Sequence, residues 1–303
     1  MTTKNKILHF DTVDRIPVFD TTFYTKNLAY GSGQEITSSQ SFNSKLPIPT
    51  PINNVTSISL KMIEFPFTVF NVRSSNNSNY FSFNISYNGV YADVNVYLKE
   101  KNYTSISTLL SDLNAGIVSA IASNASIVGG MLVLYVNPLD SSKITFKTNG
   151  TPVYGNNTWY GGTFIYPNIL ANTILGFSND GSPQRDFFRL GGDSYSYANC
   201  TNNYNLQPDN YFNMHFRNLE TSPSNANGRP STFKIPLNGT FGEVLYWNAN
   251  SGTEQIVYID RPNTTLSFVD MFISDRWGFP VYGNGALISF SLNIEYEEAY
   301  YNN

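Results

Sequence analysis

The sequence predicts an all-β protein built from antiparallel sheets, and three observations lead to that fold class. Short segments in which apolar and polar residues alternate recur along much of the chain, as in strands that have one buried face. Clusters of Gly, Pro, Asn and Asp separate these segments. Only residues 106–117 show a convincing helical period. Many short strands with almost no helix are typical of a β-sandwich or barrel.

The clearest strands lie near the C-terminal end. In residues 288–296 the apolar positions alternate with Ser, Asn and Glu, which predicts a strand with one face on a core and one toward water. Residues 266–275 carry apolar side chains on both faces, so we expect this strand to lie centrally or beneath a neighbouring subunit. Residues 275–285, which join the two, contain a proline and three glycines, as tight turns do.

A hairpin and a helix follow from local signals. Residues 81–98 alternate on both sides of Asn88-Gly89, a dipeptide that favours a two-residue hairpin turn. Apolar residues recur at helical spacing from Ile106 to Ile117, and we expect this helix to cap an open end of the sandwich. Further strands are predicted at residues 55–64, 131–136, 143–148, 212–216, 233–237 and 256–260.

These strands fit a single antiparallel jelly roll with Greek-key connections over residues 51–297. Residues 149–207 lose the alternation, and so long a structureless segment is uncommon in a compact domain, so we expect an outer insertion or long loop there. Residues 298–303 form a tail. Residues 1–50 predict an extended N-terminal arm, because isolated apolar clusters bury too little to fold alone. The apolar residues of the arm are candidates for binding a partner: Ile16, Val18, Phe19, Phe23 and Tyr24.

Three aromatic residues in the expected insertion, Trp159, Tyr160 and Tyr166, suit two interpretations. They can form an outer patch that stacks on sugar rings, as aromatic side chains do in carbohydrate-binding modules. They can equally pack within the insertion or at a contact between subunits. The sequence leaves both interpretations open.

Composition restricts the partners. The net charge is −4 and no cluster of Lys and Arg stands out, which argues against specific nucleic-acid binding. Charged residues make up 13% of the chain, against about 25% in typical soluble domains. This composition suits a protein that buries much of its exterior against other subunits, although β-rich surface domains share it. A single cysteine, Cys200, excludes an internal disulfide, and no apolar stretch is long enough for membrane insertion.

The residue types that carry catalysis are sparse. The only histidines are His9, in the expected arm, and His215, on the polar face of a predicted strand, and neither lies in a pattern typical of a triad. No nucleotide-binding motif is present. We therefore expect a protein that is not an enzyme and that has no cofactor.

Acidic residues in this sequence suggest two kinds of site. Asp270 with Asp275, or the glutamates of residues 295–298, can be read as the carboxylate pair of a glycosidase. A turn at Asp275 and a solvated tail for the glutamates are the stronger interpretations. Asp11, Asp14 and Asp20 lack the glycine and terminal glutamate of an EF-hand loop, so no metal site is expected.

Four segments, taken in their order along the chain, carry a resemblance to a known family. The segments are SISLKMIEFP at 57–66, KNYTSISTLLSDLN at 101–114, ILGF at 174–177, and FISDRWG at 272–278 leading into ISFSLNI at 288–294. They resemble the single-jelly-roll penton (vertex) capsid proteins of virophages, most closely those of the mavirus type, with relatives in polinton-like elements and giant viruses. The resemblance covers roughly residues 50 to 297.

The resemblance implies a structural role. It implies a homopentamer at each vertex of an icosahedral virion, in contact with trimers of a double-jelly-roll major capsid protein and with other minor capsid proteins. It also implies assembly in the cytoplasm of an infected eukaryotic host, an insertion that forms an outer domain, and an N-terminal arm that reaches beneath neighbouring capsomers. No catalytic residue comes with it. The alternative is a carbohydrate-binding β-sandwich, such as a viral receptor-binding spike.

Overall fold

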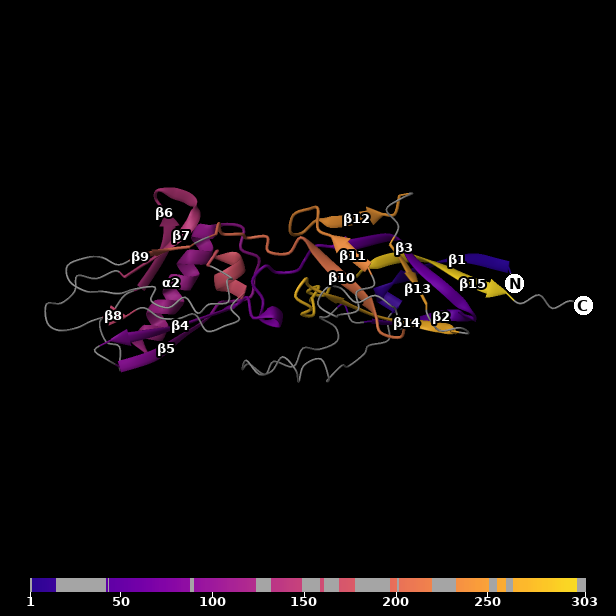
Figure 1. The fold of residues 1–303 in the computed structure, drawn as a ribbon, viewed down its shortest axis with the longest axis horizontal. Helices are drawn as coiled ribbons and strands as arrows, with labels where there is room; N and C mark the ends of the chain where they lie inside the picture. The colour runs from indigo at the N-terminus through magenta and orange to yellow at the C-terminus, as the bar shows by residue number, and fades with distance from the viewer. Residues whose placement is uncertain are drawn as a thin grey trace, which may run out of the picture. The chain divides into compact units, whose positions relative to one another are not determined.

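The computed structural model describes residues 2–14, 42, 44–87, 90–123, 132–148, 159–160, 169–177, 197–200, 202–219, 233–250, 255–259 and 264–298. The chain divides into two compact units. Unit 1 comprises Met1–Val69 and Asp209–Asn303, and unit 2 comprises Phe70–Pro208. The described residues form antiparallel sheets with little helix, which confirms the all-β prediction (Figure 1).

Unit 1 is a sandwich of two antiparallel sheets. Its elements are β1 (Thr2–Asp11), η1 (Thr12–Asp14), β2 (Ser44–Ile52), β3 (Val55–Pro66), β10 (Tyr211–Phe216), β11 (Phe233–Pro236), β12 (Val244–Asn248), β13 (Ile256–Tyr258), β14 (Leu266–Ser274) and β15 (Ser289–Glu298). Sheet A has the order β1-β15-β3-β12, and β13 also pairs with β3. Sheet B has the order β11-β10-β14-β2.

The strand order of unit 1 is that of a jelly roll. β12 and β13 pair with successive parts of β3, so they count as one interrupted strand. The described strands then number eight, and in chain order sheet A reads 1-8-3-6 while sheet B reads 2-7-4-5. Connections that cross between two four-stranded sheets in this way are the Greek keys of a jelly roll. The predicted architecture is therefore confirmed for unit 1.

The core of unit 1 lies between the two sheets, and the alternation of β15 shows why. Phe290, Leu292 and Ile294 are buried against the apolar residues of β3, while the intervening side chains form the other face. Tilted ring pairs join the two sheets, with Phe65 5.6 Å from Phe212 between ring centroids. Burial of each such side chain contributes about 1.5–3 kcal/mol relative to exposure.

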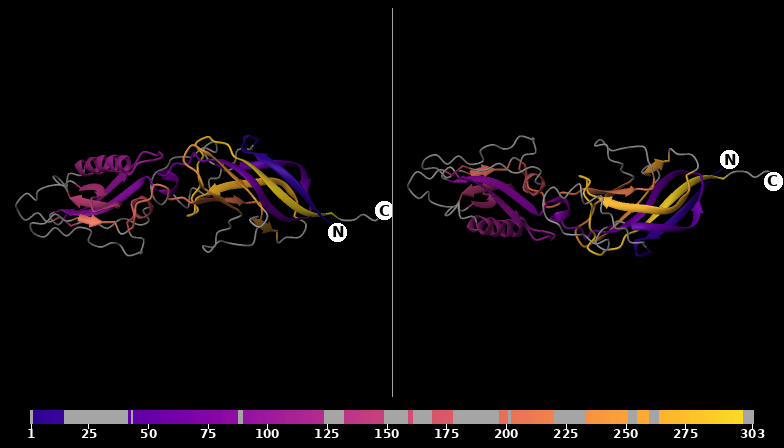
Figure 2. Two further views of the ribbon diagram at one scale, coloured as in Figure 1. Left: turned by 90° about the horizontal axis from the view of Figure 1, so that it is seen from above. Right: turned by 90° about the horizontal axis from the view of Figure 1, so that it is seen from below.

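The expected N-terminal arm of residues 1–50 differs from what the structure shows. β1 pairs with β15 along its whole length, from Thr2 opposite Glu298 to Asp11 opposite Ser289 (Figure 2). β2, which contains the proline-rich lead-in, pairs with β14. The local pattern conceals β1 because only its last inward-facing residues are apolar, so the ladder to β15 places it. The predicted partner-binding residues Ile16, Val18, Phe19, Phe23 and Tyr24 lie outside the described residues.

Unit 2 is built from two small sheets and a helix. Its elements are η3 (Ser74–Asn76), β4 (Tyr80–Tyr87), β5 (Val90–Tyr97), α2 (Ile106–Ala122), β6 (Leu132–Asn137), β7 (Asp140–Thr148), β8 (Trp159–Tyr160), η4 (Leu170–Ile174) and β9 (Tyr197–Asn199). The sheets have the orders β5-β4-β8 and β6-β7-β9. The β4–β5 hairpin and the helix were both predicted, and both are confirmed.

The helix does not cap the jelly roll, contrary to the prediction. α2 contacts β5 and β6, and its apolar face, from Leu109 to Ile121, belongs to the core of unit 2 (Figure 1). Unit 2 begins at Phe70, so the expected insertion at 149–207 is only the second half of it. The alternation in residues 81–98 predicts a strand pair but does not say which sheet it joins, which is why these strands were assigned to the jelly roll.

Gly176, in the ILGF segment, is held where no other residue fits well. Its φ is +85°, and an added Cβ would lie 2.3 Å from the backbone oxygen of Asn202. We expect Gly176→Ala to lower the free energy of unfolding by roughly 3 kcal/mol, because a left-handed conformation and overpacking against rigid backbone both disfavour alanine. Calorimetry of the purified full chain measures the shift.

Gly285 provides the matched control. Its φ is also +85°, but an added Cβ would have no atom within 4 Å. Gly285→Ala should therefore lower the free energy of unfolding by only about 1 kcal/mol, which is the cost of placing alanine in a left-handed backbone conformation. Equal losses in the two variants would contradict the packing argument.

Candidate interaction surface

The outer face of sheet A is polar at its centre, and its groups bond to one another. His9 Nδ1 and Ser291 Oγ lie 2.6 Å apart, within hydrogen-bonding distance. Ser57 Oγ donates a hydrogen bond of 2.6 Å to Glu295 Oε2. Ser57 and Ser291 are buried between larger neighbours. These polar groups at the centre of the face therefore have hydrogen-bond partners within their own chain.

The edge formed by β12 and β13 has a different character. Tyr246 and Tyr258 are 69% and 67% exposed, and Val244 and Ile256 are exposed beside them. The register with β3 places all four on the outer face of sheet A. The alternate residues of β12 turn inward and pack against the core. We call these two strands the β12–β13 edge.

The opposite edge of sheet A is β1 with η1. Ile7 is 56% exposed on the outer face, and Val13 is exposed in η1. Asp11 is the acidic residue of β1, and its carboxylate accepts hydrogen bonds from the Val13 N–H (2.9 Å) and from Ser289 Oγ (3.1 Å). Lys4 and Lys6, on the inward face, are at the beginning of the strand. In the described part of the chain, no further strand pairs with the outer side of either edge.

The edges of sheet B carry features that hinder strand addition. On β11, the Lys234 N–H donates to Gln255 Oε1 (2.6 Å) and Gln255 Nε2 donates back to the Lys234 carbonyl (2.9 Å). The glutamine amide thus occupies the place of a neighbouring strand. β2 carries Pro47, Pro49 and Pro51, which have no N–H to donate. Both are known ways to protect a sheet edge from further pairing.

The aromatic residues on the outer face of sheet B contact other side chains of the same sheet. The Phe272 ring stacks on His215 at 4.3 Å between centroids, and the Arg217 guanidinium lies 4.7 Å from the same ring. Lys45 Nζ lies 3.9 Å from the Phe268 centroid. β14 is central, as predicted, and side chains of its own chain cover part of its outer aromatic residues.

His215 differs from the prediction for it. Its place on the polar face of a strand predicted an exposed or interface residue, but it is buried within its own chain, with Nε2 2.7 Å from Ser274 Oγ. Cys200 is also buried, and burial raises the pKa of its thiol to about 12. A reactive thiol has a lowered pKa, so Cys200 is not placed as a nucleophile would be.

The acidic residues considered for catalysis do not converge. Asp275 is fully buried and closes the turn after β14, because its Oδ1 accepts the N–H groups of Trp277 (3.0 Å) and Phe279 (2.9 Å). Asp270 Oδ1 lies 3.8 Å from Arg217 Nη1. The glutamates of 295–298 belong to β15 and not to a tail, and Glu298 forms an ion pair with Lys4.

The described residues contain no group of three or more His, Cys, Asp or Glu that could hold a metal ion. Of the residues considered for calcium, Asp20 lies outside the described part of the chain. Across the same part of the chain, no helix has the length and apolar character needed to span a membrane.

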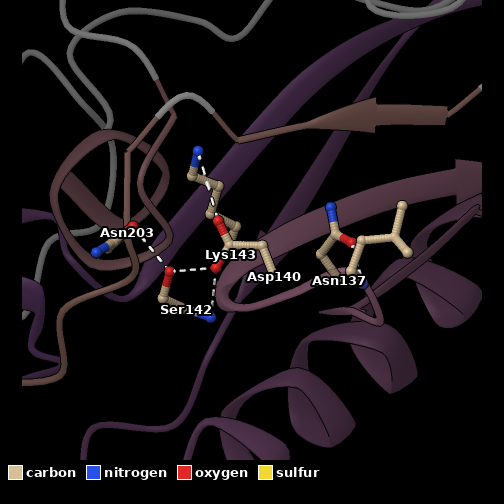
Figure 3. Close-up of polar contacts among 6 residues, drawn as sticks. Asn137, Asp140, Ser142, Lys143 and Asn203 are labelled. Atoms are coloured by element: carbon tan, nitrogen blue, oxygen red, sulfur yellow. Dashed lines mark hydrogen bonds and ion pairs between the residues drawn. The ribbon is translucent and has the colours of Figure 1, made fainter.

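In unit 2, polar contacts fix the turn between β6 and β7 (Figure 3). Asn137 Oδ1 accepts the Leu139 N–H at 2.8 Å, and Asp140 Oδ1 accepts the N–H and Oγ–H of Ser142 at 3.1 and 2.5 Å. These bonds from Ser142, with nearby Lys143, lower the pKa of the Asp140 carboxyl. The turn presents Leu139 at 95% exposure.

The predicted aromatic patch is described only in part. Trp159 and Tyr160 form β8, which pairs with the end of β4. Tyr166 lies outside the described residues. A sugar-binding role for the three therefore stays a prediction.

Sequence reasoning missed β12, which carries half of the exposed apolar residues of its edge. Residues 244–247 are Val-Leu-Tyr-Trp, which lack the polar alternation used to find strands. Enrichment in β-branched and aromatic residues was the available signal.

The strand order therefore defines a jelly roll, and unit 2 is a large insertion between its third and fourth strands. No family model matches the sequence, and no curated protein matches it. Among solved structures, the chain is similar to the mavirus penton protein, with 11% sequence identity and a TM-score of 0.44 over 96% of this chain and 99% of that one. A likeness at that level does not assign the chain to a family.

Substitution of Asp275 tests its role in the turn. We expect Asp275→Ala to reduce the free energy of unfolding by about 2–3 kcal/mol, because the two N–H groups that it accepts lose their partner. Asp275→Asn keeps an oxygen acceptor, so its free energy of unfolding should fall clearly less than that of Asp275→Ala. Denaturant unfolding of both variants measures the difference, and indistinguishable losses would show that the acceptor oxygen is not what matters.

Proposed function

We propose that this protein is a structural capsid subunit that forms the pentameric vertex of an icosahedral virion, in contact with trimers of a major capsid protein and with other minor capsid proteins. Its location would be the capsid vertex, after assembly in the cytoplasm of an infected eukaryotic host. The observation that carries the proposal is the pair of edges on sheet A that carry exposed apolar residues, whereas the edges of sheet B hinder further pairing.

A ring makes use of two different edges. In a closed cyclic assembly each copy contributes one surface to one neighbour and a different surface to the other. Sheet A has two such surfaces, since the β12–β13 edge and the β1 edge lie on its opposite sides. Paired subunits related by a two-fold axis would need only one of them.

The resemblance noted in the sequence supports the same role. Its segments lie on elements that organise both units: 57–66 on β3, 101–114 at the start of α2, 174–177 at η4, and 272–294 on β14, its turn and β15. The low charge fits as well, since charged residues are depleted in the centres of protein interfaces. The same segments cover both the jelly roll and its insertion.

The proposal predicts association through sheet A. The purified full chain should form a pentamer in sedimentation or mass photometry as its concentration rises. Tyr246→Asp combined with Tyr258→Asp should weaken association by about tenfold or more, because an exposed aromatic anchor becomes a desolvated charge. Tyr97→Asp, at a tyrosine of similar exposure in unit 2, is the matched control and should associate normally.

Cryo-EM of assembled particles supplies the decisive outcome. Density for this chain at the vertices would support the proposal. Particles that place it elsewhere, or glycan binding that is lost in Trp159→Ala without any association, would contradict it and favour the carbohydrate-binding alternative.

A further inference from the structure

We infer that the contact between neighbouring copies in the ring joins the β12–β13 edge of one copy to the β1 edge of the next, with the strands antiparallel. The inference rests on the proposed function and names the surfaces that perform it. The occupant of each edge is therefore a second copy of this chain.

Strand direction makes this contact feasible. Each adjacent pair in sheet A is antiparallel, so β1 and β12 at its two sides run in opposite directions. Rotation about an axis that lies along the strands keeps every strand direction. The β1 strand of the next copy then meets β12 in the antiparallel sense, which is the more stable pairing.

Exposed residues at the two edges of sheet A also lie at the same height along the strand direction. Ile7 lies opposite Asn293, Asn293 opposite Ser59, and Ser59 opposite Ile256. Ile7 and Ile256 are thus level on the outer face, at the two sides of the sheet. A closed ring has no axial shift between copies, so Ile7 of one copy meets Ile256 of its neighbour.

The neighbouring levels add polar complementarity. Through the same pairings, Tyr258 is level with Asn5, and Tyr246 is level with Asp11. A phenol hydroxyl donates well to an amide or carboxylate oxygen, and a carboxylate can accept more than the hydrogen bonds that Asp11 already has. The β12 and β13 strands carry no charged residue, so nothing in them repels Asp11.

The other edges fit less well. The Gln255 amide occupies the β11 edge, and three prolines interrupt donation along β2. Lys4 and Lys6 lie on the inward face of β1, so the outer face that carries Asn5, Ile7 and Asp11 has no lysine.

Cysteine cross-linking tests the contact. The full chain with Ile7→Cys and Ile256→Cys, treated with a short bis-maleimide, should give a ladder of covalent oligomers that ends at five copies. Either single variant alone should give no product, because position 7 meets position 256 and not itself. An equimolar mixture of the two single variants should give dimers only. Native Cys200 does not interfere, because it is buried and its thiol pKa is raised.

The control pairs Ile7→Cys with Val118→Cys. Val118, on α2, is 43% exposed against 44% for Ile256, so the two cysteines are equally accessible to the reagent. This variant should give no ladder.

Three results would overturn the inference in distinguishable ways. A pentamer that does not cross-link between positions 7 and 256 rejects these edges and leaves the proposed function standing. Dimers from Ile256→Cys alone show a two-fold contact in place of a ring. Absence of both oligomer and cross-link, at concentrations where the unsubstituted chain has been tested, rejects the inference and the pentamer together.

Discussion

The pairing of β15 with both β1 and β3 is the constraint on which unit 1 depends. β15 is the last strand, yet it lies between the first and third strands of the jelly roll and holds both in one sheet. The contact between His9 and Ser291 spans 282 positions of sequence. The entropic cost of closing a loop rises only slowly with loop length. This topology can therefore contain the whole of unit 2 between β3 and β10. The same long-range pairing predicts slow folding, because non-local contacts must form before they stabilise anything.

How much of this could be read from the sequence depended on whether the signal was local. Three elements were predicted because each has its own local signal. Asn88-Gly89 predicts the β4–β5 hairpin, the apolar residues at helical spacing predict α2, and strict alternation predicts β15. β1 was not, because its inward face begins with Lys4 and Lys6, and it becomes a strand only through its partner.

The interaction surface was harder to predict than the fold. Tyr246 and Tyr258 are exposed because they lie on the edge strands of sheet A, and which strands form an edge is set by the topology. The burial of His215 depends on Phe272 and Ser274, almost 60 positions away in sequence. The boundary at Phe70 was missed for the same reason, since strands of two units share one local pattern.

One of the two irregularities in the pairing of β3 with β15 connects the open edge of sheet A to the protected edge of sheet B. β3 has an extra residue at Lys61, where its register with β15 shifts between Ser291 and Leu292. β12 stops pairing opposite Met62, and β13 resumes opposite Ser59. A bulge ends pairing and bends the strand, so the edge strand leaves the ladder there. It returns through Gln255, whose amide then covers Lys234 on β11. The interruption that splits the exposed edge of one sheet thus supplies the residue that protects the other, which leaves sheet A as the side open to a neighbour.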